Sequence, residues 1–187
     1  MANKDYEYRY ATGLTLEKRD GKPAVIVGYP IVFNSLSHDL GGFREIVLPS
    51  AVDRTLSGEQ DIRAFVEHDR KEKLGRRKTN TLRLAKDDKG VRAEIDIPDT
   101  STGRDIATGL ERGDFDGMSF RFAVIADKWE RRGGENVRLL VDMEFDEVSV
   151  VGDPAYPDTT VALRSLDDIT AKNLSRLWNW LRIAESL

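Results

Sequence analysis

The sequence of 187 residues contains no cysteine. Disulfide bonds, thiolate zinc sites and cysteine nucleophiles are therefore excluded, and the composition is compatible with a reducing compartment. Histidine is scarce as well, with only His38 and His68. A metal site would depend on carboxylates and these two imidazoles, so we expect neither a metal nor a cofactor.

Long apolar runs and an excess of basic charge are also lacking. The opening residues, 1–10, are polar and charged where a signal peptide needs an apolar run, and no later segment has the apolar length to span a bilayer. We therefore expect an intracellular protein outside the membrane. With 29 basic and 33 acidic side chains, bulk electrostatics does not favour nucleic-acid binding. The basic stretch 70–78 is interpreted as a solvated charged loop, and contact with acidic scaffold or nucleic acid is the alternative.

The sequence does contain many short segments with strand periodicity, separated by glycine-rich turns. These segments are 6–12, 24–33, 61–68, 81–85, 91–97, 120–127, 137–143 and 145–151. A short helix is expected after Ser50, and a second one is expected to begin at Thr100–Thr102 and to end at Gly113. This pattern predicts a mainly β (α+β) fold, with a closed or barrel-like antiparallel sheet ringed by a few helices. The first two segments should pair as a hairpin.

The periodicity changes near residue 164, which divides the chain into a cored domain, residues 5–163, and a linker with a C-terminal amphipathic helix, residues 164–187. The apolar residues at helical spacing in the second part are Leu174, Leu177, Trp178, Leu181 and Ala184. This helix either docks on the core or serves as a detachable, partner-binding tail.

The stretch GDFDGMSFRF, residues 113–122, delivers Ser119 to the start of an apolar strand just past a glycine-rich corner. A serine there can be a small polar filler or a nucleophile. As a nucleophile it needs a base within hydrogen-bonding reach, and histidine is the side chain that suits neutral pH. His38 lies in a loop of glycine and polar residues, whereas His68 ends a strand with a buried face. His68 is the more rigid candidate, although it could also be a structural histidine.

A third group that accepts a hydrogen bond from the other nitrogen of the imidazole would fix its tautomer. The segment MEFDEVSVV offers Asp146 and Glu147, which must point to opposite faces of a strand. By strict alternation Glu147 shares its face with Phe145, Ser149 and Val151, and an inward carboxylate requires a partner. That partner is either the histidine or an arginine, and Asp146 is interpreted as the solvated residue.

Five blocks carry a resemblance to a known family. They are GYPIVFNSLSHDLGGFREIVLPSAVDRTL, VEHD, LGRRKTNTLRLAKDDKGVRAEIDIPDTSTGRDI, GDFDGMSFRF and FDEVSVVGDPAYPDT. In this order, over roughly residues 29–161, they resemble the prohead maturation proteases of tailed bacteriophages. That family is similar in fold to the herpesvirus assemblins. The resemblance implies a serine protease with Ser119 as nucleophile, His68 as general base and Glu147 as third member.

The resemblance also implies the biological setting. We expect a serine endopeptidase of capsid maturation that cleaves scaffold, or the scaffolding segment of the major capsid protein, and itself. It would act in the host cytoplasm inside the assembling prohead, with a homodimer as a hypothesis for its active form. Arg121 departs from the family pattern, where a small residue is expected, so its side chain must point away or read the substrate. Arg131–Gly134 is an oxyanion-site candidate by analogy only.

Two alternatives come from other classes of protein. A non-catalytic β-barrel module that binds capsid or scaffold through its terminal helix would leave Ser119 and His68 far apart. A metal hydrolase would use His68, Asp69 and nearby acids, but two histidines and no cysteine give it little support.

Overall fold

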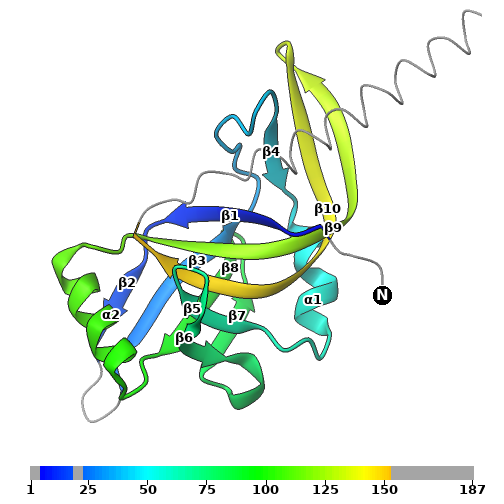
Figure 1. The fold of residues 1–187 in the computed structure, drawn as a ribbon. Coiled ribbons are helices and arrows are strands. Elements are labelled where there is room, and N and C mark those ends of the chain that lie inside the picture. The colour runs from blue at the N-terminus through cyan, green and yellow to red at the C-terminus, as the bar shows by residue number, and fades with distance from the viewer. Residues whose placement is uncertain (1–4, 19–22, 153–187) are drawn as a thin grey trace, which may run out of the picture.

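Two open β-sheets form most of the chain in a computed structural model that describes residues 5–18 and 23–152 (Figure 1). The first has six strands, in the order β1-β9-β10-β5-β6 with β4 also paired to β10, and the second has four, in the order β2-β3-β8-β7. The strands are β1 (Glu7–Thr12), β2 (Thr15–Glu17), β3 (Val25–Val32), β4 (Arg44–Val47), β5 (Arg63–Val66), β6 (Asp69–Arg76), β7 (Leu82–Lys86), β8 (Gly90–Asp96), β9 (Gly117–Arg132) and β10 (Glu135–Val151).

The predicted mainly β fold is confirmed, whereas the closed barrel is wrong for the part of the chain that the structure describes. The six-stranded sheet is also mixed rather than antiparallel, because β10 pairs in parallel with β4 and β5. The chain crosses from the first sheet to the second at Gly13, which has a φ of 94° that suits glycine. Strand β1 consequently pairs with β9, and only the short β2 pairs with β3. The hairpin expected between 6–12 and 24–33 therefore does not form, and both sheets end in edge strands.

One hydrophobic core joins the two sheets. Alternate residues of each strand point to it, as the two-residue period of a strand requires. Its fully buried members include Ile26, Ile31, Val91 and Ile95 from the four-stranded sheet and Phe122, Phe145, Val148 and Val150 from the six-stranded sheet. The opposite face of the six-stranded sheet is therefore available for polar side chains.

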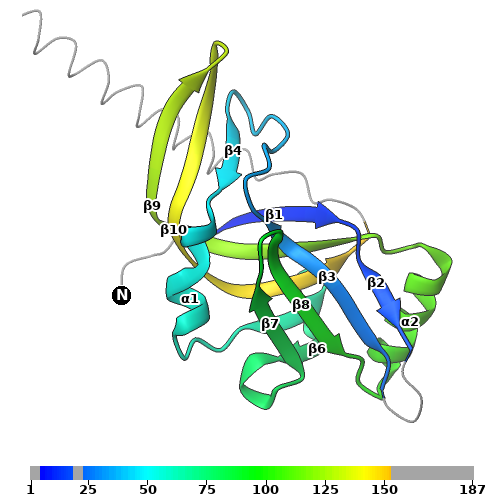
Figure 2. The same ribbon diagram turned by 180° about the vertical axis from the view of Figure 1, so that it is seen from behind.

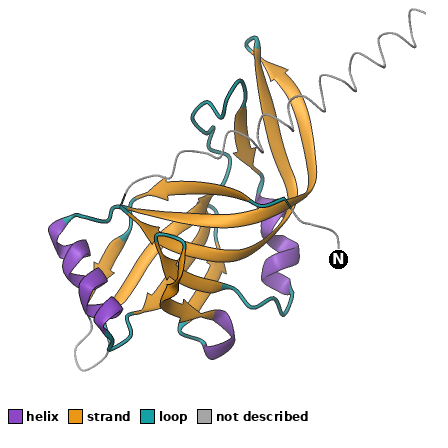
Figure 3. Cartoon of the chain, viewed as in Figure 1, coloured by secondary structure: helices purple, strands orange, loops and turns teal. Residues whose placement is uncertain are grey.

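Short helices lie at the periphery (Figure 3). They are η1 (Pro49–Val52), α1 (Asp53–Ser57), η2 (Arg77–Thr79) and α2 (Ser101–Arg112). Helix α2 has the caps that the sequence predicts: the Thr100 hydroxyl accepts from the Gly103 amide at 3.1 Å, and Gly113 ends the helix with a φ of 81°. The turn after Gly113 leads directly into β9. None of the helices in the described ranges is long and apolar enough to cross a membrane.

Strands β9 and β10 form a long hairpin whose outer half projects from the body of the molecule, with β4 beside it (Figures 1 and 2). Gly133 and Gly134, both with positive φ, make the turn at its tip. The predicted strands 137–143 and 145–151 are thus one continuous strand. The helix expected in 164–187 and the domain boundary at 163 lie outside the described residues.

A buried ionic cluster fastens β1 and β4 to this hairpin. Arg138 of β10, only 4% exposed, donates to both carboxylate oxygens of Glu7, at 2.9 and 3.0 Å, and to Glu45 at 3.3 Å. Arg9 donates to the same two carboxylates, at 2.7 and 2.9 Å, and Asp127 accepts from Arg138 at 2.7 Å. Burial raises the pKa of Glu45, although the charges of Arg9 and Arg138 oppose this effect.

Candidate active site

Ser119 lies on the face of the six-stranded sheet opposite to the core. Its neighbours Met118 and Phe120 point into the core, so the alternation of β9 turns Ser119 the other way. The pairing register places Ser119 between Tyr10 of β1 and Ser149 of β10. The Ser119 side chain is nevertheless buried, at 2% exposure, and its partners come from distant parts of the sequence, as predicted.

His68 occupies the turn between β5 and β6, which is a correction to its predicted position at the end of a strand. Val66 pairs with Asp69, so Glu67 and His68 form a two-residue turn, and both have positive φ, 47° and 60°. Asparagine and glycine usually fill such turns. The basic stretch after it, expected as a loop, begins as strand β6.

Two hydrogen bonds hold this unfavourable turn against the end of β10. The Glu67 amide donates to the Val150 carbonyl at 3.0 Å, and the Glu67 carboxylate accepts from the Gly152 amide at 2.7 Å. A non-glycine residue in the left-handed region costs about 1–3 kcal/mol and persists only where its surroundings enforce it. The turn is therefore held in place by contacts with the strand that carries Glu147.

Glu147 reaches the same face because of a bulge in β10. Phe145 pairs with Phe122, but the register then shifts, and Glu147 pairs with Arg121. Asp146 is the extra residue, as in a β-bulge. The prediction that Glu147 shares the face of Phe145 is thus wrong: Phe145 points into the core, and Glu147 lies with Ser149 on the opposite face. Glu147 is buried, at 2% exposure.

The three side chains form one hydrogen-bonded series. The Nε2 atom of His68 lies 2.8 Å from the Oγ atom of Ser119, and its Nδ1 atom lies 2.6 Å from Oε1 of Glu147. Ser149 Oγ donates to the same Glu147 oxygen at 3.4 Å. The structure thus brings together the three residues that the sequence singles out. This is the order of contacts that a nucleophile, a base and an orienting acid require.

Arg121 points away from Ser119 toward the carboxylates. It binds both oxygens of Asp146, at 3.0 and 2.6 Å, and its Nε atom lies 3.6 Å from Oε2 of Glu147. The Tyr6 ring covers the guanidinium at 4.5 Å. Burial acts to lower the pKa of Arg121, but Asp146 and Glu147 outweigh it and raise that pKa. Asp146, predicted to be solvated, is therefore an ion-pair partner, and Arg121 supplies a permanent positive charge beside Glu147.

Strand β1 supplies two contacts that sequence reasoning missed. The Tyr8 ring packs edge-on against the imidazole of His68, with centroids 4.6 Å apart. The carbonyl oxygen of Arg9 accepts from Ser119 Oγ at 2.9 Å. The alternation of tyrosines at positions 6, 8 and 10 was a signal that one face of this strand is aromatic, but its partner strand β9 could not be inferred.

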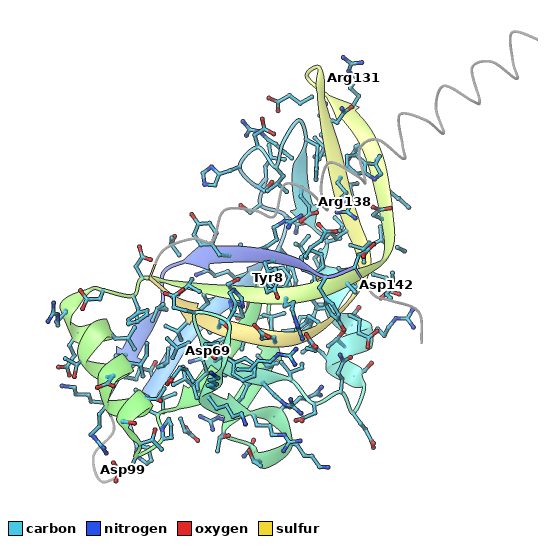
Figure 4. All side chains as sticks on the ribbon, in the orientation of Figure 1. Tyr8, Asp69, Asp99, Arg131, Arg138 and Asp142 are labelled. Carbon is cyan, nitrogen blue, oxygen red and sulfur yellow. The ribbon has the colours of Figure 1, made fainter. Side chains whose placement is uncertain are left out.

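The remaining candidates lie elsewhere. Asp69, proposed for a metal hydrolase, accepts from the Lys71 amide, and among the described residues no three histidine or acidic side chains form a group that could hold a metal ion. Arg131 is at the tip of the projecting hairpin, while Tyr8 lies on the sheet below (Figure 4). Roughly 40 Å of β9 separate it from Ser119, at about 3.3 Å per residue, which removes Arg131–Gly134 as an oxyanion site in this structure.

Comparisons with known proteins identify the family. The sequence matches the family described as caudovirus prohead serine protease over residues 12–172, whereas a comparison with curated proteins finds no significant match. Among solved structures, the bacteriophage T4 capsid assembly protease, gp21, is similar with a TM-score of 0.46 and 12% identity, over 79% of this chain and 99% of that chain. Because the family match spans well over half of the sequence, the chain belongs to the caudovirus prohead serine protease family.

Proposed function

We propose that this protein is a serine endopeptidase of capsid maturation in which Ser119 is the nucleophile, His68 the general base and Glu147 the residue that orients the imidazole. The observation that carries the proposal is the pair of contacts made by His68, 2.8 Å to Ser119 and 2.6 Å to Glu147. Burial of Ser119 and Glu147 strengthens both contacts, because water competes weakly for them.

The chemistry follows from these contacts. Nε2 of His68 takes the hydroxyl proton as Ser119 Oγ attacks the scissile carbonyl carbon, and the imidazolium then gives this proton to the leaving amine. The acyl-enzyme is hydrolysed by water, with His68 again acting as base. The Glu147 carboxylate accepts from Nδ1, so it selects the tautomer with a free Nε2 and stabilises the imidazolium.

The single hydrogen of the Ser119 hydroxyl has two acceptors within reach, Nε2 of His68 and the carbonyl oxygen of Arg9. A carbonyl only accepts, so when this hydrogen points to Arg9, a hydrogen bond between Ser119 and His68 requires a proton on Nε2. That arrangement is inactive. A neutral imidazole with its proton on Nδ1 draws the hydroxyl hydrogen away from Arg9, and this is the reactive arrangement.

The family membership supports substrates from the assembling capsid. The proposed substrates are scaffold or the scaffolding segment of the major capsid protein, inside the prohead in the host cell, and the protease itself. Mass spectrometry of the purified chain after incubation tests self-cleavage. A discrete fragment that is missing from the Ser119→Ala variant supports it, and an intact chain in an active preparation contradicts it.

Coexpression with the capsid protein tests the catalytic assignment. Ser119→Ala should abolish capsid processing without unfolding the protein, whereas Ser57→Ala, at an exposed serine of α1, should process normally. A fluorophosphonate should label Ser119 stoichiometrically. Capsid binding without labelling or cleavage would instead support a non-catalytic capsid-binding module.

A further inference from the structure

A cavity of about 150 Å³ lies beside Ser119, between strand β1 and the loop that joins β3 to β4. Tyr8 and Tyr10 line it from the strand, residues 37–40 line it from the loop, and Ser119 itself belongs to the lining. The cavity adjoins a second hollow of about 340 Å³ that continues along residues 9–12 of the same strand. A chain bound at Ser119 therefore has a space for one side chain next to the nucleophile.

The loop wall of this cavity is already formed. Leu40 is buried, at 4% exposure, and packs with Phe43 against Trp129 of the projecting hairpin. The Leu40 amide also donates to the Phe43 carbonyl at 2.8 Å. The wall is thus fixed by a small apolar cluster of its own, so the cavity does not depend on a bound substrate for its shape.

The side chains of Ser37 and Asp39 are engaged within the loop and its flanks. Ser37 Oγ donates to the His38 carbonyl at 2.7 Å and accepts from the Glu45 amide at 2.8 Å. Asp39 accepts through one oxygen from two glycine amides, at 3.0 and 2.7 Å. The tyrosine rings, Leu40 and the exposed imidazole of His38 are consequently the groups left to contact a side chain that enters the cavity.

Charge also selects what can enter. The guanidinium of Arg9 is bound to Glu7 and Glu45, so it does not offer a free cation to a carboxylate. Asp39 is the acidic residue of the lining, and its carboxylate repels another carboxylate at a pH at which the imidazole of His38, also in the lining, is uncharged. A volume near 150 Å³ with apolar walls is the size that holds a benzene ring. The cavity therefore suits an uncharged apolar group and disfavours an acidic one.

From this geometry we infer that the cavity is a specificity pocket for one apolar side chain of the protein substrate, of the size of leucine, methionine or phenylalanine, within two residues of the scissile bond. The inference rests on the proposed function and names the class of substrate that the site selects. Tyr10 and Leu40 are its specificity-determining residues, while Tyr8 contacts both the pocket and His68.

Profiling with a peptide library made from a digested proteome tests this inference without a known substrate. Mass spectrometry of the products should show, at one position within two residues of the cut, leucine, methionine and phenylalanine enriched about tenfold over aspartate and glutamate. Tyr10→Ala should enlarge the pocket, lower that enrichment about tenfold and favour tryptophan. Tyr10→Phe keeps the ring and should keep the profile.

Two further variants separate pocket effects from general damage. Ile125→Ala shortens an exposed apolar residue of β9 outside the pocket and should leave the profile unchanged. Asp39→Asn keeps an acceptor for the glycine amides but removes the charge, so cleavage of peptides with glutamate at the selected position should rise about two- to fivefold.

The possible failures are distinguishable. An active wild-type protein without apolar enrichment on either side of the cut would overturn the pocket and leave the protease assignment standing. An active Tyr10→Ala variant with the wild-type profile would do the same. A folded wild-type protein that neither cleaves the library nor reacts with the fluorophosphonate at Ser119 would overturn both.

Discussion

Two buried carboxylate clusters lie on the six-stranded sheet and its hairpin, and they differ in the cation that each contains. Around Arg138, the carboxylates of Glu7 and Glu45 face two guanidinium groups. Around His68, the carboxylate of Glu147 lies 3.6 Å from the Arg121 guanidinium but makes its short contact, 2.6 Å, with an imidazole whose other nitrogen contacts a hydroxyl. Arginine is always charged in a protein, whereas histidine gains and loses a proton near neutral pH.

This difference separates a structural cluster from the proposed reactive one. In the arginine cluster the donors and acceptors saturate one another, and the cluster joins residues as far apart as Glu7 and Arg138. In the histidine cluster one nitrogen is free to accept a proton from Ser119. A buried glutamate thus indicates only that a cation is near, and the identity of that cation decides whether the site can carry out proton transfer.

The largest effect is expected for Glu147→Gln. Glutamine keeps the shape of the side chain, but it removes the charge that stabilises the imidazolium and can hold His68 in the wrong tautomer. The rate at which a fluorophosphonate labels Ser119 should fall by about a thousandfold to ten thousandfold. The unfolding midpoint in urea should change little. A rate within tenfold of wild type would remove Glu147 from the catalytic group.

Arg138→Met should have the opposite pair of effects, a large loss of stability with little change in the labelling rate. It leaves Glu7 and Glu45 buried beside a single guanidinium, so the free energy of unfolding should fall by about 3–5 kcal/mol. The labelling rate per folded molecule should stay within a few fold of wild type, because Arg138 does not touch the site. Urea unfolding and active-site titration measure the two quantities.

Arg131→Met is the matched control for Arg138→Met. It makes the same chemical change at the exposed tip of the hairpin, where the arginine donates only to the nearby Gly134 carbonyl among the contacts seen. It should change the free energy of unfolding by no more than about 0.5 kcal/mol. Equal effects for the two variants would mean that the buried cluster contributes no more than an exposed side chain.

The sequence predicts part of the fold because some signals are local. The Thr100 cap, the Gly113 stop and the alternation around Ser119 each depend on a few neighbouring residues, and each is found in the structure. The pairing of β1 with β9 is not local: it joins residues more than a hundred positions apart. This is why the predicted hairpin is wrong.

The candidate active site, too, could be predicted from the sequence only in part. The contact between Ser119 and His68 was predicted with the help of the family resemblance, and it is present. The left-handed turn at Glu67 and His68 could not be foreseen, because two consecutive non-glycine residues rarely adopt that conformation and tertiary contacts impose it here. The bulge at Asp146 was hidden too, since one inserted residue moves every later side chain to the other face.

Glu67 links the reactive cluster to the end of β10, and we expect an intermediate effect there. Glu67→Ala removes the acceptor for the Gly152 amide, a charge-assisted contact that solvent weakens because the Glu67 side chain is exposed. His68 should then sample other positions, so the labelling rate per folded molecule should fall about tenfold. Glu67→Gln retains an acceptor oxygen and should recover most of this rate. Equal rates for Glu67→Ala and wild type, with only the unfolding midpoint lowered, would make Glu67 purely structural.

The smallest effect on stability is expected for an exposed ion pair, which can be compared with the two buried clusters. Arg54 of α1 donates through Nε to Asp142 of β10, at 3.0 and 2.9 Å. This hydrogen bond lowers the pKa of Asp142 below its ordinary value of 3.8. A carboxyl group with a lowered pKa in the folded state stabilises the protein above its unfolded-state pKa, and this contribution is lost as the pH falls through the folded-state pKa.

Asp142→Asn should therefore destabilise the protein at pH 7 by less than about 1 kcal/mol, because solvent screens a pair in which Arg54 is 60% exposed. The difference from wild type should shrink as the pH is lowered from 5 toward 3, as measured by urea unfolding at each pH. Asp88→Asn, in the exposed turn between β7 and β8, controls for the loss of one negative charge. If the Asp142→Asn difference stayed constant or grew over that range, the pair with Arg54 would not be its source, and the amide itself would be responsible.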